Sequence, residues 1–398
     1  VMVEDTGVTV IGSSLQGKRV ILAVSGGIAA TESVKLAREL RRHGAEVFPM
    51  MTKSAEKVIT PLALSWGSGM EVATDWESHM SQLGGFDGLI LAPATRNTIA
   101  KFVNGILDSP TMMAISASYG RGVPILFVPS MHNDLFNDPM TDDLLSELVN
   151  MEVDVMISSE NEGKRKQPEA TCIVAEFCNL LNRRMDDRKR VAITLGANIA
   201  PLDSVRSIVN TSSGNTGWSI AEHLHRMGHE VVCVVGRTSQ GPSFDLPDVR
   251  YAESSDSMLE ESILVAKSGE KPDYWIHAAA ILDYAPEPMV GKVPSNSGDW
   301  EITLSPRLKH LKELKDYVNG SKRIAFKLEV SGDEDSLISK SKDLISENEL
   351  LAVVANMLND VHGDSDSRCR IVFSDGKVSE IADLRELCEA IETIITSN

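Results

Sequence analysis

The chain has 398 residues, of which 42% are hydrophobic and 24% are charged, and its formal net charge is −18 at pH 7. This length predicts two or three domains, each able to bury a core. The acidic charge argues against a broad nucleic-acid-binding surface, and no apolar run is long enough to span a bilayer. The five cysteines form no CxxC pair, and the opening residues, VMVEDTG, lack the features of a secretory signal. We therefore expect neither a disulfide framework nor a zinc site, and a cytoplasmic location.

The first half opens with a strand–loop–helix–strand pattern. The segment from Gly17 to Thr52 begins with an apolar strand, passes through the loop SGGI (25–28) into an amphipathic helix, and ends in a second strand. Further apolar runs follow at Gly88 to Ala92 and at Val123 to Val128. Buried-type strands that alternate with helices predict a parallel sheet with helices on both faces.

The second half repeats this pattern after a basic, polar segment, NRRMDDRKR, from Asn182 to Arg190. We place the domain boundary there, near Asp187, which gives domains over 1–186 and 187–398. The strand from Arg190 to Leu195 leads into a loop, a helix-like run and another strand, and later strand-like runs are YWIHA (274–278), RIAF (323–326), LAVVA (351–355) and RIVF (370–373). The predicted fold class is α/β, with two doubly wound domains and mainly parallel sheets.

The stretch from Asp203 to Gly217, DSVRSIVNTSSGNTG, lies between that strand and a helix-like run from Trp218 to Met227. At a strand-to-helix turn, free backbone N–H groups and the positive end of the helix dipole point at one spot, and small residues let an anion approach closely. The pattern indicates a phosphate or nucleotide site. An ordinary Ser/Gly-rich loop before a helix would have the same composition, and neither half contains a GxGxxG or Walker motif.

The order of motifs resembles that of the bifunctional phosphopantothenoylcysteine decarboxylase/phosphopantothenate–cysteine ligase family of coenzyme A biosynthesis. The resemblance extends from about residue 17 to about residue 390. Its motifs in the first half are SGGIAA (25–30), His79, APATRNT (92–98) and PSMH (129–132). Those in the second half are LDSVRSIVNTSSGNTG (202–217), AAILDY (279–284), GKVPS (291–295), AFKLE (325–329) and VVAN (353–356). The resemblance implies a flavodoxin-like flavoprotein domain followed by a Rossmann-like ligase domain.

For the first half, the resemblance implies FMN-dependent decarboxylation of phosphopantothenoylcysteine to 4′-phosphopantetheine. In the family, the flavin oxidises the cysteine moiety to a thioaldehyde-like group, which is the electron sink for loss of CO₂. His79 is the expected base, because histidine moves protons near neutral pH, and His132 is a second expected catalytic residue. The residues expected to contact the flavin are Ser25, Gly26, Gly27, Ile28, Thr52, Ser54, Ala94, Thr95 and Asn97.

Two departures from the family pattern fall in this half. Most bacterial members have Asn at the position of His132, and they carry a Cys in a substrate clamp that is absent from the matching stretch, Ser158 to Ala170. In both respects the chain is similar to the archaeal branch. The basic run KRK (164–166) is a candidate for holding a phosphate or carboxylate. The proton donor that replaces the Cys stays open, and Cys172 is at a position typical of a core residue.

For the second half, the resemblance implies ligation of 4′-phosphopantothenate to L-cysteine with CTP through an acyl-cytidylate. This chemistry needs cations, Mg²⁺ and a backbone that cradles phosphates, although no protein ligand for the metal can be named. Asn210 is expected to hold the acyl-cytidylate and Lys292 to support its turnover. Further nucleotide or substrate contacts are expected from Gly196, Arg206, Ser212, Ser213, Gly214, Ala279, Ala280, Asp283, Phe326, Lys327, Lys340 and Lys342.

Several alternatives stay open. The loop GANIAP (196–201) differs from the family's GGTREP-like loop, and the choice between CTP and ATP is not settled by any residue. The missing clamp Cys favours a ligase with a flavodomain that no longer decarboxylates, whereas His79 argues against a purely regulatory flavodomain. A dinucleotide-dependent oxidoreductase is disfavoured by the lack of GxGxxG. The resemblance also implies a homo-oligomer in which flavodomain trimers are joined by ligase dimers, for example a dodecamer.

Overall fold

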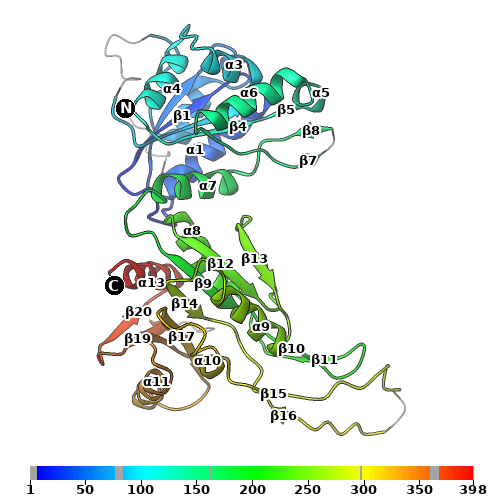
Figure 1. Ribbon diagram of the computed structural model, residues 1–398. Coiled ribbons are helices and arrows are strands. Elements are labelled where there is room, and N and C mark those ends of the chain that lie inside the picture. The colour runs from blue at the N-terminus through cyan, green and yellow to red at the C-terminus, as the bar shows by residue number, and fades with distance from the viewer. Residues whose placement is uncertain (1–6, 77–83, 162, 296–297, 359–366, 398) are drawn as a thin grey trace. The chain divides into compact units, whose positions relative to one another are not determined.

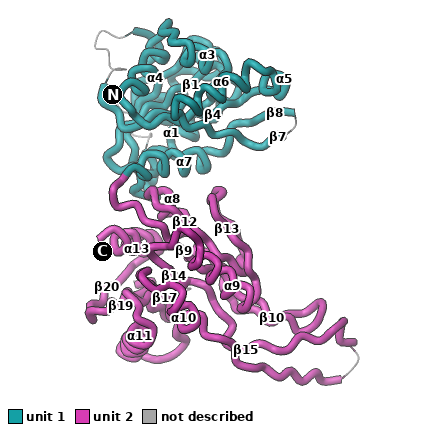
Figure 2. Tube along the Cα trace, viewed as in Figure 1, with its two compact units in different colours: residues 1–184 teal, residues 185–398 magenta. Residues whose placement is uncertain are grey.

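A computed structural model describes residues 7–76, 84–161, 163–295, 298–358 and 367–397 (Figure 1). The chain divides into two compact units, Val1–Arg184 and Met185–Asn398 (Figure 2). Within the described ranges, no helix is both long and apolar enough to cross a membrane.

Unit 1 is built on a parallel sheet of five strands in the order β2-β1-β3-β4-β6. These strands are β1 (Arg19–Val24), β2 (Glu46–Met51), β3 (Gly88–Ala94), β4 (Ile125–Pro129) and β6 (Asp154–Val155). The helices are α1 (Ser33–Arg42), α2 (Pro61–Ser68), α3 (Arg96–Val103), α4 (Pro110–Gly120), α5 (Asn133–Phe136), α6 (Pro139–Asn150) and α7 (Ala170–Asn182), with short 3-10 helices at Ile28–Glu32 and Ala55–Lys57. A second, antiparallel sheet joins β5 (Met131–His132), β8 (Lys164–Arg165) and β7 (Glu160–Asn161).

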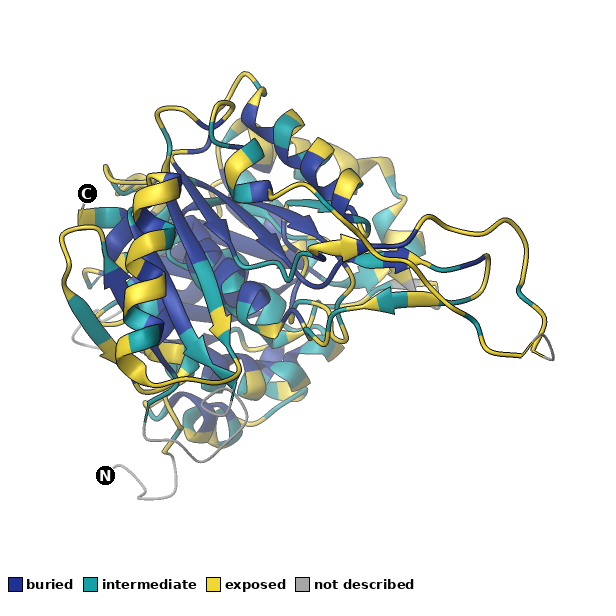
Figure 3. Ribbon diagram, turned by 90° about the horizontal axis from the view of Figure 1, so that it is seen from below, coloured by how far each residue is buried: buried dark blue, intermediate teal, exposed yellow. Residues whose placement is uncertain are grey.

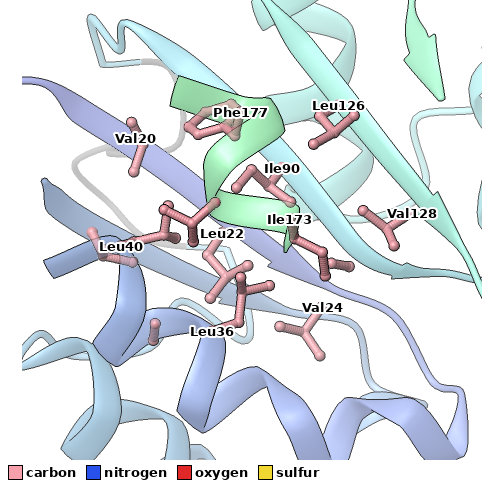
Figure 4. Packing of buried hydrophobic residues seen from close by; sticks show 14 of the residues in the cluster. Val20, Leu22, Val24, Leu36, Leu40, Ile90, Leu126, Val128, Ile173 and Phe177 are labelled. Carbon is pink, nitrogen blue, oxygen red and sulfur yellow. The ribbon is translucent and has the colours of Figure 1, made fainter. Parts of the chain in front are cut away.

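Both faces of this sheet are buried, which is why its strands are continuous apolar runs. On one face, Val20 and Leu22 of β1 pack with Leu36 of α1 and Phe177 of α7 (Figure 4). Residues of β1 with the opposite parity, such as Ile21, belong to a separate core with α3, α4 and α6. The carboxyl ends of the parallel strands therefore open at one edge, where their loops can form a site.

Unit 2 is built on an eight-stranded sheet in the order β13-β12-β9-β14-β17-β18-β19-β20. The strands are β9 (Arg190–Leu195), β12 (Glu230–Val235), β13 (Asp248–Tyr251), β14 (Tyr274–His277), β17 (Lys322–Glu329), β18 (Ala352–Met357), β19 (Cys369–Phe373) and β20 (Val378–Ile381). The helices are α8 (Asn215–Arg226), α9 (Ser255–Ala266), α10 (His310–Glu313), α11 (Glu334–Asn348) and α13 (Leu384–Ser397). The strands from β13 to β18 pair in parallel, whereas β19 and β20 pair antiparallel at one edge.

Helices also cover both faces of this second sheet. Trp275 of β14 packs in one core with Met258 of α9, and a neighbouring core joins α11 to β17 and β18. Helices α8 and α13 contact each other on the opposite face (Figure 1). The central strands β9, β12 and β14 are largely buried, while the outward sides of the helices are exposed (Figure 3). The predicted fold class, α/β with two mainly parallel sheets, is confirmed.

The segment after β9 differs from the single turn that we expected between a strand and a helix. It first forms an antiparallel hairpin of β10 (Ile199–Pro201) and β11 (Ser207–Val209). Helix α8 then begins at Asn215, three residues before the predicted Trp218. The hairpin and a second pair, β15 (Tyr284–Ala285) with β16 (Ser305–Pro306), form an arm that projects from the sheet (Figure 1).

Candidate functional site

Three loops of unit 1 meet at the carboxyl edge of its sheet. The Ser25 hydroxyl, just after β1, donates to the Pro93 carbonyl (2.7 Å) and accepts from the Thr95 N–H (2.9 Å). A Cβ placed on Gly26 would overlap Ser54, so only glycine lets the loop after β1 pass this close to the loop after β2. The Thr52 N–H bonds to the Val24 carbonyl at 3.0 Å and fixes that second loop.

These loops border a cavity of about 650 Å³. Among the residues expected at the cofactor or catalytic site, Gly26, Gly27, Ile28, Thr95 and His132 line it. The lining also includes residues that sequence reasoning did not single out, among them Glu32, Lys35 and Arg96. The remaining predicted residues lie outside the lining: Ser25 and Ala94 are buried behind it, Ser54 and Asn97 are exposed, and Thr52 is half-buried.

The stretch expected to act as a clamp forms the β7–β8 hairpin, and β8 pairs with β5 so that His132 is opposite Lys164. Arg165 and Lys166 of this stretch line the cavity. The Arg165 guanidinium lies 4.4 Å from the centre of the Phe136 ring and donates to the Ser158 carbonyl at 3.0 Å. The hairpin thus brings two cations to the same cavity as His132. His79, the expected base, lies outside the described residues.

In unit 2, the loops after β9 and β12 meet the first turn of α8. Gly196 and Gly214 have positive φ angles of 83° and 78°, and a Cβ on either would crowd Thr238. Gly214 precedes α8 and provides no side-chain cap, and the N–H group of Asn215, the first helical residue, donates to the Ser213 hydroxyl at 3.3 Å. Ser212 and Ser213 lie directly before this turn, and the Ser213 carbonyl accepts from the Ser239 N–H at 3.1 Å.

Asn210 connects this turn to the loop after β14. Its side-chain N–H₂ donates to the carbonyls of Ala280 and Ile281, both at 3.1 Å. The Ala280 N–H in turn donates to the Gly196 carbonyl at 2.8 Å. The structure therefore gathers Asn210, the serine-rich turn and the Ala279–Ala280 segment, which are far apart in the sequence.

Arg206 makes contacts within the arm. Its guanidinium pairs with Asp203 at 2.8 Å and lies 4.7 Å from the centre of the Trp300 ring. The Asp203 carboxylate also accepts from the N–H groups of Val205 and Arg206 (both 2.8 Å) and of Val293 (3.1 Å). Although burial raises the pKa of Asp203, these bonds and the Arg206 charge lower it to about 2. Lys292 is exposed next to the anchored Val293.

A second cavity, of about 740 Å³, opens beside this region. Of the predicted nucleotide residues, Asp283, Phe326 and Lys327 line it, and Asp283 pairs with Lys309 at 2.6 Å. Lys340 and Lys342 are not among the lining residues. Lys340 and Lys327 both pair with Glu329, at 2.9 and 3.0 Å, and their hydrogen bonds lower the Glu329 pKa.

Sequence reasoning missed His277 and His310, which also line this cavity. Burial lowers the pKa of His277 to about 3, and the nearby charge of Arg323 and the ring of His310 add to the shift. His277 is therefore neutral at physiological pH. The sequence did contain a signal for His277. This histidine ends the apolar strand YWIH, and a polar residue at the carboxyl end of a buried strand is a candidate site residue.

In the comparison with known proteins, each unit matches a family model. Residues 11–182 match the Flavoprotein family model, and residues 187–396 match the model of the DNA/pantothenate metabolism flavoprotein C-terminal domain. The Coenzyme A biosynthesis bifunctional protein CoaBC of Thermococcus kodakarensis is 32% identical over 351 residues, which cover 86% of each chain. The chain belongs to this bifunctional family.

Two further proteins are similar to this chain. The CoaBC protein of Bacillus subtilis is 28% identical and is matched over 96% of both chains. A solved DNA/pantothenate metabolism flavoprotein from Streptococcus pneumoniae is 22% identical, with a TM-score of 0.47 over 52% of this chain and 99% of that one. The family predicted from the motifs is confirmed by the two family-model matches and by the two CoaBC relatives.

Proposed function

We propose that the chain carries out two steps of coenzyme A biosynthesis, the ligation of 4′-phosphopantothenate to L-cysteine and the decarboxylation of the product to 4′-phosphopantetheine. The observation that carries this proposal is the match to bifunctional CoaBC relatives across both units. Each unit also contains its own cavity, with predicted site residues in its lining.

We assign the decarboxylation to unit 1 and propose that its cofactor is FMN. The cavity fits such a cofactor because Gly26 leaves backbone room at its border and Ile28, 81% exposed, offers an apolar surface beside it. When bound, the flavin supplies the electron sink for loss of CO₂. Gly26, Gly27, Ile28 and Thr95 would hold it, while Ser25 fixes the position of Thr95. Arg165 and Lys166 supply positive charge for the phosphate or carboxylate of the substrate.

We assign the ligation to unit 2, with CTP and Mg²⁺. A carboxylate is a poor electrophile, and its activation on a nucleotide requires that negative charge on the phosphates be neutralised. The serine-rich turn before α8 offers backbone N–H groups, and Lys309 and Lys327 supply positive charge at the second cavity. Within the described residues no cluster of metal-ligating side chains is found, so we propose that Mg²⁺ enters with the triphosphate.

The direct test is mass spectrometry of the purified protein with 4′-phosphopantothenate, cysteine, CTP and Mg²⁺. The expected product is 4′-phosphopantetheine, formed with loss of CO₂. Accumulation of phosphopantothenoylcysteine would show that the ligase is active and that the clamp without Cys does not support decarboxylation. Formation of neither product with CTP or ATP would contradict both assignments.

His79 is the residue to test as the base of the decarboxylation. We expect His79→Asn to abolish formation of 4′-phosphopantetheine, because the variant side chain cannot accept a proton, and to leave CTP-dependent ligation unchanged. Both products are measured in one reaction, so the ligation rate is the internal control for folding. Wild-type decarboxylation in this variant would rule out the assignment.

We further propose that the protein acts in the cytoplasm as a homo-oligomer, with trimers formed by unit 1 and dimers formed by unit 2. Light scattering of the purified chain would give its mass in solution. A monomer under assay conditions would contradict this proposal without affecting the two activities.

A further inference from the structure

The cavity of unit 2 has a buried floor and a charged rim. Thr194, His277 and Phe326 come from the carboxyl ends of the adjacent parallel strands β9, β14 and β17. Thr194 and His277 are only 3% and 8% exposed, as expected for a floor. The lysines at the border are more accessible, with 64% of the Lys309 side chain and 35% of the Lys327 side chain exposed. The lining contains more lysines (Lys309, Lys312, Lys315 and Lys327) than acidic residues (Asp283 and Glu347), so the cavity has an uncharged interior below an entrance with an excess of positive charge.

Among the buried polar side chains of the floor, His277 has unused hydrogen-bonding capacity. His310 already bonds through Nε2 to the Ser255 hydroxyl at 3.0 Å, and the Asn348 side chain donates to the Leu344 carbonyl at 3.1 Å. The Nε2 atom of His277 is buried and has no hydrogen-bond partner among the described residues. The ring is fixed by Trp275, onto which it stacks at 5.8 Å with an angle of 12° between the planes. A buried polar atom without a partner destabilises the protein, unless a ligand or water completes the bond.

The uncharged, partly apolar floor of the cavity favours binding of the uncharged part of a nucleotide, its base. A phosphate would be placed at the rim lysines, where its charge is both paired and hydrated. The lining instead combines two apolar residues, Ile281 and Phe326, with the planar His277 ring. A neutral imidazole has one N–H donor and one lone pair, so it can read the polar edge of a heteroaromatic base.

We propose that His277 is a specificity-determining residue that hydrogen-bonds the base of the nucleotide, while the triphosphate lies toward the rim lysines. This inference rests on the proposed function, in which the cavity takes CTP. His277 thereby discriminates between nucleotides that differ in their base. The lysines bind the phosphates that all of these nucleotides share.

The test compares ligand affinities of the full chain by titration calorimetry. We expect His277→Ala to weaken CTP binding about tenfold, the effect of one hydrogen bond to a buried group, and to reduce the preference for CTP over UTP and ATP. Binding of inorganic triphosphate should not change, because it lacks a base. His277→Gln retains a donor and an acceptor and should recover part of the preference.

The matched control is Tyr274→Phe, which removes a buried hydroxyl without a described partner from the same strand. That variant should bind CTP like the wild type. If His277→Ala keeps the affinity and preference of the wild type, or loses triphosphate and CTP equally, the inference is wrong. If the wild type binds no nucleoside triphosphate, the ligase assignment itself fails, and this inference fails with it. Retained triphosphate binding by His277→Ala shows that the cavity is still formed.

Discussion

Lys292 is exposed and forms no ion pair within the described residues, which leaves its ammonium group available for a ligand. If Lys292 stabilises phosphate charge as the family resemblance implies, we expect Lys292→Gln to slow ligation about 100-fold, because the variant removes that cation. Mass spectrometry should also detect accumulated acyl-cytidylate. The control is Lys271→Gln, since Lys271, like Lys292, is an exposed lysine outside both cavity linings, but lies between α9 and β14 and outside the arm. A wild-type ligation rate in the Lys292 variant would exclude this role.

The Gly26→Ala variant tests whether the close approach of the loops after β1 and β2 shapes the site in unit 1. The Cβ of Gly26→Ala would overlap Ser54 and force the loops apart, at a cost of about 1–3 kcal/mol. We therefore expect the flavin affinity to fall at least tenfold, which fluorescence titration measures. In Gly120→Ala, the added Cβ meets no atom within 4 Å, so flavin binding should not change. Equal affinities in both variants would show that the contact does not shape the site.

At the scale of elements, Asp203 joins the β10–β11 hairpin to the segment that carries Lys292. Its folded-state pKa of about 2 is below the ordinary value of 3.8, so the ionised carboxylate stabilises the fold above pH 3.8. This stabilisation is lost as the pH falls from 3.8 to about 2. We expect Asp203→Asn to unfold more easily than the wild type at pH 7, with the difference shrinking over that acidic range. Urea unfolding at several pH values measures it, and a difference independent of pH would contradict the assignment.

The sequence predicted the central strands well because continuous apolar runs such as GLILA and YWIHA have few alternatives to a buried parallel sheet. It did not predict the β10–β11 hairpin, because residues 199–209 lack the alternation of apolar and polar residues that marks a half-buried strand. The sequence also did not predict that the charge of Arg206, an expected ligand contact, is paired with Asp203 three residues earlier. Whether a side chain faces a ligand or a neighbouring carboxylate depends on tertiary contacts that local patterns do not encode.

At the scale of the whole molecule, the lining residues of each cavity come from one unit only. We therefore expect the two activities to be separable. A mixture of the His79→Asn and Lys292→Gln proteins should form 4′-phosphopantetheine from 4′-phosphopantothenate, cysteine and CTP, whereas neither protein alone should do so at the wild-type rate. If the mixture failed while the Lys292 variant still decarboxylated added phosphopantothenoylcysteine, the two sites would have to act within one chain.

Arg323 links elements that line the second cavity. From β17, its guanidinium donates to the carbonyl of Leu311 in α10 and to that of Asn348 at the end of α11, the latter at 3.0 Å. The strand and the two helices are therefore held together before any ligand arrives. Binding then has little conformational entropy to overcome at the cavity floor, so association should be fast and mainly enthalpic at 25 °C.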